Sequence, residues 1–418
     1  MTSKIGKIFL GALFLLSLAL PAFGYTVEGA KGERFTMRGY VDLDIGYRNT
    51  SKEYNTAVST SYGTGVDRTV FFVMLPSSAL IGNFTVGDVS ADWAIATSST
   101  TLQSNMQAVG TSNQKDNDII DIFYATYKFG NSHIIAGKIG SNWTTFLPQT
   151  TFGYNPGTGT HVNCIAFGGI YDNKLPAIRF GQTINKMFSY HIALITTGTY
   201  VADTATTTYP PFSAPKNSNL SYSKFPTIAA KFTLNFGPVL ILPGLAYQQV
   251  QWDGLPAGWD TTMTSWAVTL PGKVVIGPFV GLFNIAYGKN IGGPTGSVSF
   301  TSDGYYTGFQ RNNVTGKIYD TTNIQGFIDL SMTFGPVTPH IFYGITHSTN
   351  DLWVVGNKYH ERTSMGINAY IQVSKNFQVI PEFARYTYGA TPGWVSPTGA
   401  KWDFGSDWLA GVKLRLTF

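Results

Sequence analysis

The sequence predicts an all-β protein, a transmembrane antiparallel β-barrel of about 16 strands with short turns at one end and long loops at the other. Three features predict this fold: a low content of charged residues with a high content of aromatic residues, an alternation of apolar and polar residues with a period of two, and short turns that alternate with long polar loops along the chain. Only 12% of the 418 residues are charged, whereas 15% are Phe, Trp or Tyr and 46 are Gly. Soluble domains carry about 25% charged residues, so much of this surface is expected to face lipid. The high apolar content also excludes a disordered chain.

The N-terminus predicts export from the cytoplasm. Lys4 and Lys7 precede an apolar run at residues 8–20, and small residues follow it, which is typical of a secretory signal over residues 1–24. The barrel is then expected over residues 25–418. A membrane helix needs about 20 apolar residues, so the run is too short to span; an uncleaved anchor is the alternative.

Alternation indicates strands with one apolar and one polar face. In residues 34–48 the odd positions are almost all apolar, while the even positions include Arg38, Asp42 and Asp44. Successive side chains of a strand point to opposite faces, so these charges are expected on one side of the sheet. The same pattern recurs in residues 226–236, 362–374 and 407–418.

Gly, Pro and Asn suit tight turns because they accept or preset turn dihedrals. On this basis short turns are predicted at residues 85–87, 130–131, 185–186, 237–238, 277–278, 335–336 and 375–376. Long polar loops are predicted at residues 49–66, 98–116, 141–173, 197–224, 251–260, 289–321, 348–360 and 389–405. Seven turns and eight loops make fifteen connections, which join sixteen strands with both termini on the short-turn side. Even strand numbers and this asymmetry are typical of bacterial barrels.

The sheet is expected to be closed. Hydrocarbon offers no hydrogen-bond partners, so every backbone group must be paired and no sheet edge can remain. Phe129, Phe236, Phe334 and Phe377 lie beside short turns, and we expect them in an interfacial aromatic girdle. The alternative is that they cap a soluble core. A barrel of sixteen strands is too wide for side chains to fill and leaves an aqueous channel.

The last strand carries a family resemblance. Residues 406–418 place Trp408 and alternate apolar residues on one face and end at Phe418. This segment resembles the C-terminal strand of outer-membrane barrel proteins, which implies that the barrel-assembly machinery reads it. Across the mature chain the pattern resembles the sixteen-stranded porins of Gram-negative bacteria, and residues 137–146 are similar to a strand-to-loop segment of DcaP-like porins.

The resemblance implies a function and a location for the protein. Porins of this type lie in the cell outer membrane, form homotrimers and let small hydrophilic solutes diffuse passively through a pore narrowed by the third loop. By position that loop is residues 141–173, and an ordinary exposed loop is the alternative. Its candidate constriction residues are Trp143, Phe146, Tyr154, His161 and Asp172.

The alternation also predicts which charges line the pore, because the face opposite the apolar one should enclose water. The predicted pore-lining residues are Arg38, Asp42, Asp44, Asp92, Lys138, Arg179, Lys231, Asp329, Arg362, Lys413 and Arg415. Basic residues outnumber acidic ones seven to four in this set, which predicts a mild preference for anionic or neutral polar solutes. The alternative for any one of them is a place at the barrel rim.

Rival functions are a barrel-type surface enzyme and a plugged structural or adhesive barrel. The six histidines form no HExxH motif, and Cys164 is the only cysteine, so no disulfide or thiolate metal site is expected. We therefore expect a non-enzymatic protein with no cofactor and no metal. The net charge of +5 is too small to suggest a nucleic-acid partner; the expected partners are membrane lipid and small solutes.

Overall fold

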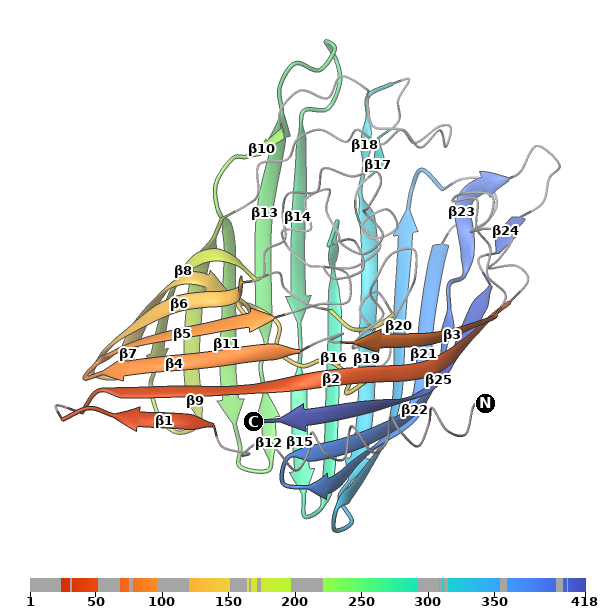
Figure 1. The fold of residues 1–418 in the computed structure, drawn as a ribbon. Coiled ribbons are helices and arrows are strands. Elements are labelled where there is room, and N and C mark those ends of the chain that lie inside the picture. Colours follow the sequence, from red (N-terminus) through yellow and green to blue (C-terminus); the bar gives the residue numbers. More distant parts are fainter. Residues whose placement is uncertain are drawn as a thin grey trace, which may run out of the picture.

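A computed structural model describes residues 24–30, 32–51, 68–74, 78–96, 120–150, 164, 167–170, 174–196, 221–291, 308, 310–311, 315–353, 359–395, 401–403 and 405–418. The regular elements of these residues are all strands (Figure 1). No helix among them is both long and apolar enough to cross a membrane. The predicted signal at residues 1–24 lies almost entirely outside the described part of the chain.

The strands are β1 (Tyr25–Glu28), β2 (Arg34–Thr50), β3 (Arg68–Met74), β4 (Ala79–Val86), β5 (Val89–Ala96), β6 (Ile120–Phe129), β7 (Ser132–Ile139), β8 (Leu175–Thr183), β9 (Phe188–Ile195), β10 (Ser221–Ser223), β11 (Thr227–Asn235), β12 (Val239–Ile241), β13 (Gly244–Trp252), β14 (Thr262–Thr269), β15 (Gly272–Ile276), β16 (Phe279–Lys289), β17 (Gln310–Arg311), β18 (Ile318–Tyr319), β19 (Thr321–Met332), β20 (Val337–Asn350), β21 (Tyr359–Ser374), β22 (Phe377–Thr387), β23 (Ala390–Val395), β24 (Lys401–Asp403) and β25 (Ser406–Thr417).

The main sheet is antiparallel and closes on itself. β2 pairs with β3 and β4, each wall position after them pairs with the next one up to β22, and β25 pairs with both β22 and β2. Four wall positions are shared by two consecutive segments: β3 with β4, β10 with β11, β12 with β13, and β14 with β15. The predicted closed barrel of sixteen strands is therefore confirmed.

The closing seam joins the two ends of the chain. Tyr40 to Thr50 of β2 pair with Thr417 to Asp407 of β25. Below them the backbone N–H of Gly39 donates to the Phe418 carbonyl at 2.7 Å, and the Phe418 N–H donates back at 2.9 Å. The short strand β1, which the alternation does not predict, continues the line of β25 along the start of β2.

Prolines explain two of the divided wall strands. Pro243 separates β12 from β13, and Pro271 separates β14 from β15. Proline has no N–H to donate to a ladder, but its carbonyl still accepts. The N–H groups of Phe232 and Leu242 accordingly donate to Pro243 and Pro271, each at 2.8 Å, so the wall stays paired across the breaks.

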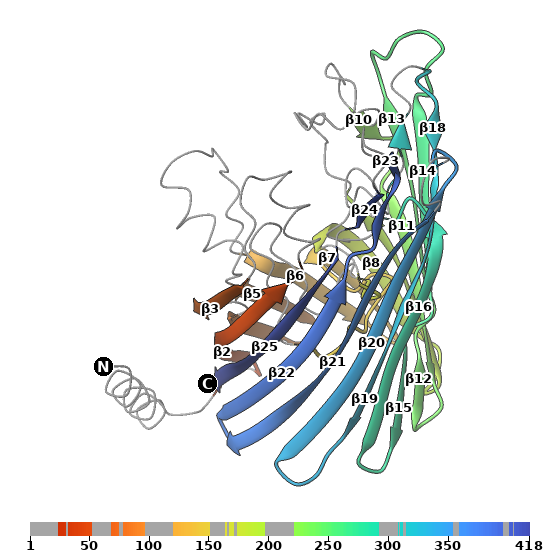
Figure 2. The same cartoon turned by 90° about the vertical axis from the view of Figure 1, so that its right-hand side faces the viewer.

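The two ends of the barrel differ, as predicted. Short turns close one end, with glycines at φ +56° in the turns at Gly130 and Gly277. That left-handed conformation favours glycine. The hairpins β17–β18 and β23–β24 lie at the opposite end (Figures 1 and 2).

The two faces of the wall also differ. On β19 the outward Ile324 and Ile328 are 52% and 45% exposed, whereas the inward Gln325 and Asp329 are each 1% exposed. Exposed aliphatic and aromatic residues recur on the outward positions of the other long strands. A large exposed apolar surface marks a membrane or protein contact, and on a closed barrel it forms the belt that lipid requires.

Candidate functional site

The interior of the barrel is the candidate site, and most predicted wall residues share its face. Asp42, Asp44, Lys231, Asp329 and Lys413 are buried on the inward positions of their strands. The remaining inward predictions are partly buried or exposed: Arg38, Asp92, Arg179, Arg362 and Arg415. Their side chains alternate with outward apolar neighbours.

Lys138 was predicted to line the pore, but the structure places it on the outward face. In β7 the exposed Ile134 marks the outward face, and Lys138 lies on that same face four residues later. The register pairs Lys138 with Phe123, which is 58% exposed. The Lys138 ammonium group donates to the Ile120 carbonyl at the outer end of the wall. It therefore does not line the pore.

A segment after β7 turns into the barrel, and its first part packs on a row of alanines. Ala193, Ala229, Ala246 and Ala267 are direct cross-strand neighbours on the inward face of β9, β11, β13 and β14. Trp143 is fully buried in one cluster with all four. Because alanine and glycine are small, the backbone of the segment approaches the wall closely. A Cβ added to Gly244 would lie 1.7 Å from the Trp143 carbonyl oxygen.

Polar wall side chains hold this first part by its backbone. The Lys231 ammonium donates to the Ser141 carbonyl at 2.6 Å and to the Thr145 hydroxyl at 2.7 Å. The Thr269 hydroxyl donates to the Trp143 carbonyl at 3.0 Å. Further along the wall, the His191 ring nitrogen lies 2.8 Å from the Asn142 carbonyl. Hydrogen bonds from a charged donor are the stronger kind, so Lys231 is the main tether.

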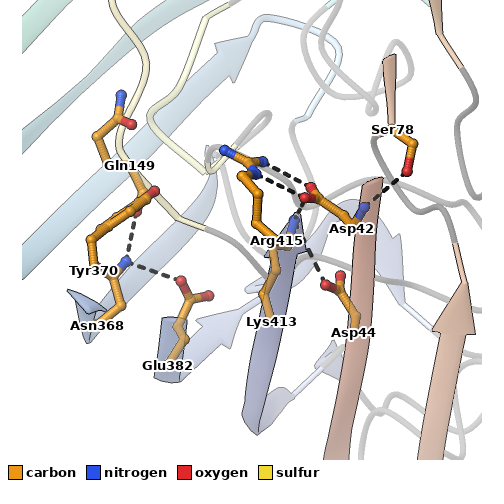
Figure 3. Close-up of polar contacts among 9 residues, drawn as sticks. All are labelled: Asp42, Asp44, Ser78, Gln149, Asn368, Tyr370, Glu382, Lys413 and Arg415. Carbon is orange, nitrogen blue, oxygen red and sulfur yellow. Dashed lines mark hydrogen bonds and ion pairs between the residues drawn. The ribbon is translucent and has the colours of Figure 1, made fainter. Parts of the chain in front are cut away.

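Gln149 fixes the segment against the opposite part of the wall (Figure 3). Its N–H donates to the Asp329 carboxylate on β19 at 2.6 Å. Its carbonyl accepts from the Asn368 amide on β21 at 2.6 Å and lies 3.4 Å from the Tyr370 hydroxyl. Asn368 also donates to Glu382 on β22 at 3.0 Å.

A second close approach follows at residues 164 and 167–170. The Gly168 N–H donates to the Thr346 hydroxyl at 2.9 Å, and the Phe167 carbonyl accepts from Ser364 at 2.9 Å. A Cβ added to Gly344 would lie 2.1 Å from that carbonyl oxygen. Burial of Cys164 raises the pKa of its thiol to about 12, so the thiol is a neutral packed group at ordinary pH.

These contacts show that residues 141–150 run across the interior. Their wall partners begin on β9 and β11 and end on β19 and β21, which lie on different sides of a closed ring. Of the predicted constriction residues, Trp143 faces the alanine row and Phe146 lies on the crossing segment, partly buried. Tyr154, His161 and Asp172 lie outside the described residues.

A charged cluster lies on the inner wall at the seam (Figure 3). Arg415 binds the two oxygens of Asp42 at 2.7 and 2.8 Å, and Lys413 lies between Asp42 and Asp44 at 3.3 and 3.7 Å. The backbone N–H of Asp42 donates to the Ser78 hydroxyl at 3.0 Å, where β2 passes from β3 to β4. Bidentate carboxylate–guanidinium pairs fix geometry as well as charge, so this part of the wall is rigid and its charges largely compensate.

Comparisons with known proteins bear on the fold of the chain. The OmpT outer membrane protein of Vibrio cholerae, folded in vitro, matches with a TM-score of 0.50 and 9% identity, over 94% of this chain and 99% of that chain. The fold is that of an outer-membrane β-barrel. OmpF of Salmonella typhi, in complex with daunomycin, matches with a TM-score of 0.50 and 10% identity, over 94% and 100% of the two chains. No family model and no curated relative matches the sequence. The predicted resemblance to sixteen-stranded porins is thus confirmed in the fold.

The sequence prediction did not include several inward residues. Glu382 alternates with the outward Phe383, so the same parity argument would have found it. Arg48 alternates with the outward Tyr47 and belongs to the charged face predicted for residues 34–48, although the predicted pore-lining set omits it. Arg48 forms a buried ion pair with Asp407 at 2.5 Å. The sequence did not indicate the roles of Gln149 and Asn368, because a neutral amide side chain in a loop or strand does not predict a particular hydrogen-bond partner.

Proposed function

We propose that the protein is a channel of the outer membrane through which small hydrophilic solutes diffuse passively. The observation that carries the proposal is the segment at residues 141–150, which crosses the interior between β9 and β21 and is hydrogen-bonded at both ends. A sixteen-stranded barrel otherwise encloses a wide aqueous channel. A segment tethered across it limits the size of the solutes that pass without closing the barrel.

The outward face supports placement in a membrane. Ile178 and Ile285 are each 60% exposed, and Ile341 and Ile367 are 58% and 55% exposed. In water each would forgo about 25 cal/mol per Å² of apolar burial, whereas lipid solvates them. The outer membrane is the place where barrels of this architecture occur.

The interior supports weak selection by charge. Asp42 is compensated by Arg415 and Lys413, and Arg48 is compensated by Asp407. The other inward charges lie on two different parts of the wall. The basic residues Arg179 and Lys231 lie on β8 and β11, whereas the acidic residues Asp329 and Glu382 lie on β19 and β22. With Lys138 outside the pore, the surplus of basic wall residues shrinks. The proposal is therefore a mild preference for neutral polar or anionic solutes.

The proposal includes assembly but no catalysis. Phe418 is hydrogen-bonded into the seam, and the proposal includes recognition of β25 by the barrel-assembly machinery. A homotrimer follows from the resemblance to porins. The proposal assigns the chain no catalytic chemistry, no cofactor and no metal.

Liposome swelling tests the proposal. Purified protein is reconstituted into liposomes that are diluted into isotonic sugars of graded size. We expect swelling rates that fall steeply with sugar size, and faster entry of the larger sugars when Lys231→Met releases one end of the crossing segment. Lys128→Met, at an exposed site beside a short turn, is the matched control. Protein that folds and inserts but never increases swelling would contradict the proposal.

Reversal potentials test the charge preference separately. In planar bilayers under a KCl gradient we expect a potential near zero or slightly anion-selective. Clear cation selectivity would contradict the assignment of the inner wall charges.

A plugged barrel is the second candidate, because the inner wall is well covered on one side. Asn323 and Ser348 are each 0% exposed, and Gln325 is 1% exposed, so the interior along β19 and β20 is filled. The swelling experiment separates the two candidates, since a plugged barrel admits no sugar of any size.

A further inference from the structure

The outer wall carries a cation, Arg385, among apolar side chains, where hydrocarbon does not solvate a charge. Arg385 lies on the outward face of β22, between Met365 on β21 and Trp408 on β25. Both neighbours are exposed, at 43% and 38%. The Arg385 guanidinium lies over the Trp408 ring at 5.0 Å. Its Nε is buried without a hydrogen-bond partner, and Arg385 forms no ion pair within the described part of the chain.

Its height on the wall is that of an interface. Arg385 is eight residues above Phe377, which starts β22 beside the short turn. With a rise of about 3.3 Å per residue and a strand tilt near 45°, this places it about 19 Å above that end of a band about 25 Å tall. A charge costs about 2–4 kcal/mol at the midplane and much less near the interface. Arg385 therefore lies in the headgroup-proximal part of the belt.

An apolar groove runs down the wall from this cation. Its upper part has a volume of about 460 Å³ and is lined by Arg385, Trp408, Tyr343 and Met365 among others. Its lower part, about 760 Å³, extends to Phe279 near the short turns. The two parts share Leu330, Ile341, Ile367 and Phe383, so they form one groove with a cationic upper end.

From this geometry we infer that the groove over β16–β22 binds a phosphate-bearing membrane lipid, with the phosphate on Arg385 and an acyl chain along the groove. Charge complementarity decides the occupant. The upper end offers guanidinium donors without a partner in the described residues, which match phosphate oxygens. The rest of the groove is mainly apolar, although Ser331, His340, Asn368 and Glu382 also border its lower part. A second copy of the chain would have to bring a carboxylate to the same point. The inference rests on the membrane placement in the proposed function, and not on channel activity.

Lipid binding to the full chain in neutral detergent tests the inference. Native mass spectrometry would follow addition of phosphatidylglycerol, of diacylglycerol with the same chains, and of inorganic phosphate. We expect one phosphatidylglycerol retained per chain, with diacylglycerol and inorganic phosphate each bound at least about tenfold more weakly. Equal binding of diacylglycerol, or equal competition by inorganic phosphate, would overturn the inference without any variant.

Variants locate the site. Arg385→Gln should weaken phosphatidylglycerol binding about tenfold or more, in line with the loss of a hydrogen bond to a charged group, and Arg385→Lys should restore part of it. Ala369→Phe should also weaken binding by filling the lower groove. Lys317→Gln is the control, because Lys317 also lies over an aromatic ring, that of Tyr319, at 5.3 Å, away from the groove.

The outcomes separate this inference from the proposed function. Arg385→Gln should leave liposome swelling unchanged, because Arg385 does not face the pore. Unchanged lipid binding in Arg385→Gln would overturn the inference while the channel proposal stood. An oligomer in detergent that Arg385→Gln dissociates would assign the groove to a second copy and likewise overturn it.

Discussion

A single methyl group at Gly244 should displace the inward segment. An added Cβ would lie 1.7 Å from the Trp143 carbonyl oxygen and 3.0 Å from the Thr269 hydroxyl oxygen. Real Cβ contacts do not fall below 3.0 Å, so in Gly244→Ala the carbonyl must move by at least 1.3 Å, the difference of the two distances. Gly244 is paired with Lys231 and Thr269 on the neighbouring strands, so the segment yields rather than the wall.

The energetic consequence follows from the contacts that are lost. The hydrogen bond from Thr269 to the Trp143 carbonyl, at 3.0 Å, contributes about 0.5–1.5 kcal/mol, and partial unpacking of the buried Trp143 ring adds a similar amount. We expect the free energy of local opening to fall by about 1–3 kcal/mol. Since 1.4 kcal/mol is a factor of ten, amide exchange at residues 142–146 should accelerate about tenfold to a hundredfold.

Hydrogen–deuterium exchange of the detergent-solubilised protein measures this directly. Gly281→Ala is the matched control, because the nearest atoms to its added Cβ lie at 3.4 and 3.8 Å, which is ordinary contact. Gly281→Ala should exchange like the wild type at residues 142–146. If Gly244→Ala did so too, with the barrel folded, the close packing of the segment on β13 would be refuted.

Three further outcomes follow from buried contacts. Arg48→Met should cost about 3–5 kcal/mol of stability, because it leaves the fully buried Asp407 carboxylate without its ion pair; the guanidinium unfolding midpoint should fall well below that of Arg38→Met, and equal midpoints would contradict the buried pair. Asp329→Asn should accelerate amide exchange at Gln149, since the acceptor of its N–H loses its charge, and an unchanged exchange rate would show that Asn368 holds the segment alone. Burial raises the pKa of the Cys164 thiol from 9.0 to about 12, so the stability it contributes is full below about pH 9 and is lost as the pH rises toward 12. Accordingly, iodoacetamide should modify Cys164 rapidly only in denaturant, and rapid labelling of the folded barrel at pH 8 would contradict its burial.

The alternation of apolar and polar residues predicted the barrel well, because a lipid environment requires apolar side chains on the outward face. A residue such as Ile324 or Asp329 cannot exchange faces without exposing a charge to hydrocarbon or an aliphatic group to the interior. The turns were equally predictable, since glycines such as Gly130 and Gly277 take left-handed dihedrals that few residues accept. These constraints act locally on each strand, so one sequence shows them without knowledge of the partner strands.

Lys138 was misplaced because the two faces of β7 are both apolar. Ile134 faces outward, but Ile135 and Ile139 face inward, where they pack in one cluster with Trp143. Alternation therefore disappears where the inner wall is covered by protein rather than by water. The error has the same physical origin as the constriction: a strand that looks apolar on both faces is a strand against which another part of the chain packs.

Small inward residues mark the part of the wall on which the inward segment packs. An inner wall that faces only water should carry polar side chains, yet β9, β11, β13 and β14 present Ala193, Ala229, Ala246 and Ala267 in direct register. Small residues at inward positions leave room for the backbone of the inward segment to approach the wall. Flanking polar groups such as Lys231 and Thr269 then donate hydrogen bonds to the carbonyls of that segment. The position of the narrowing is thus set by the strands and not by the loop alone. Larger side chains in that row should displace the segment toward the pore axis while leaving the outer belt unchanged.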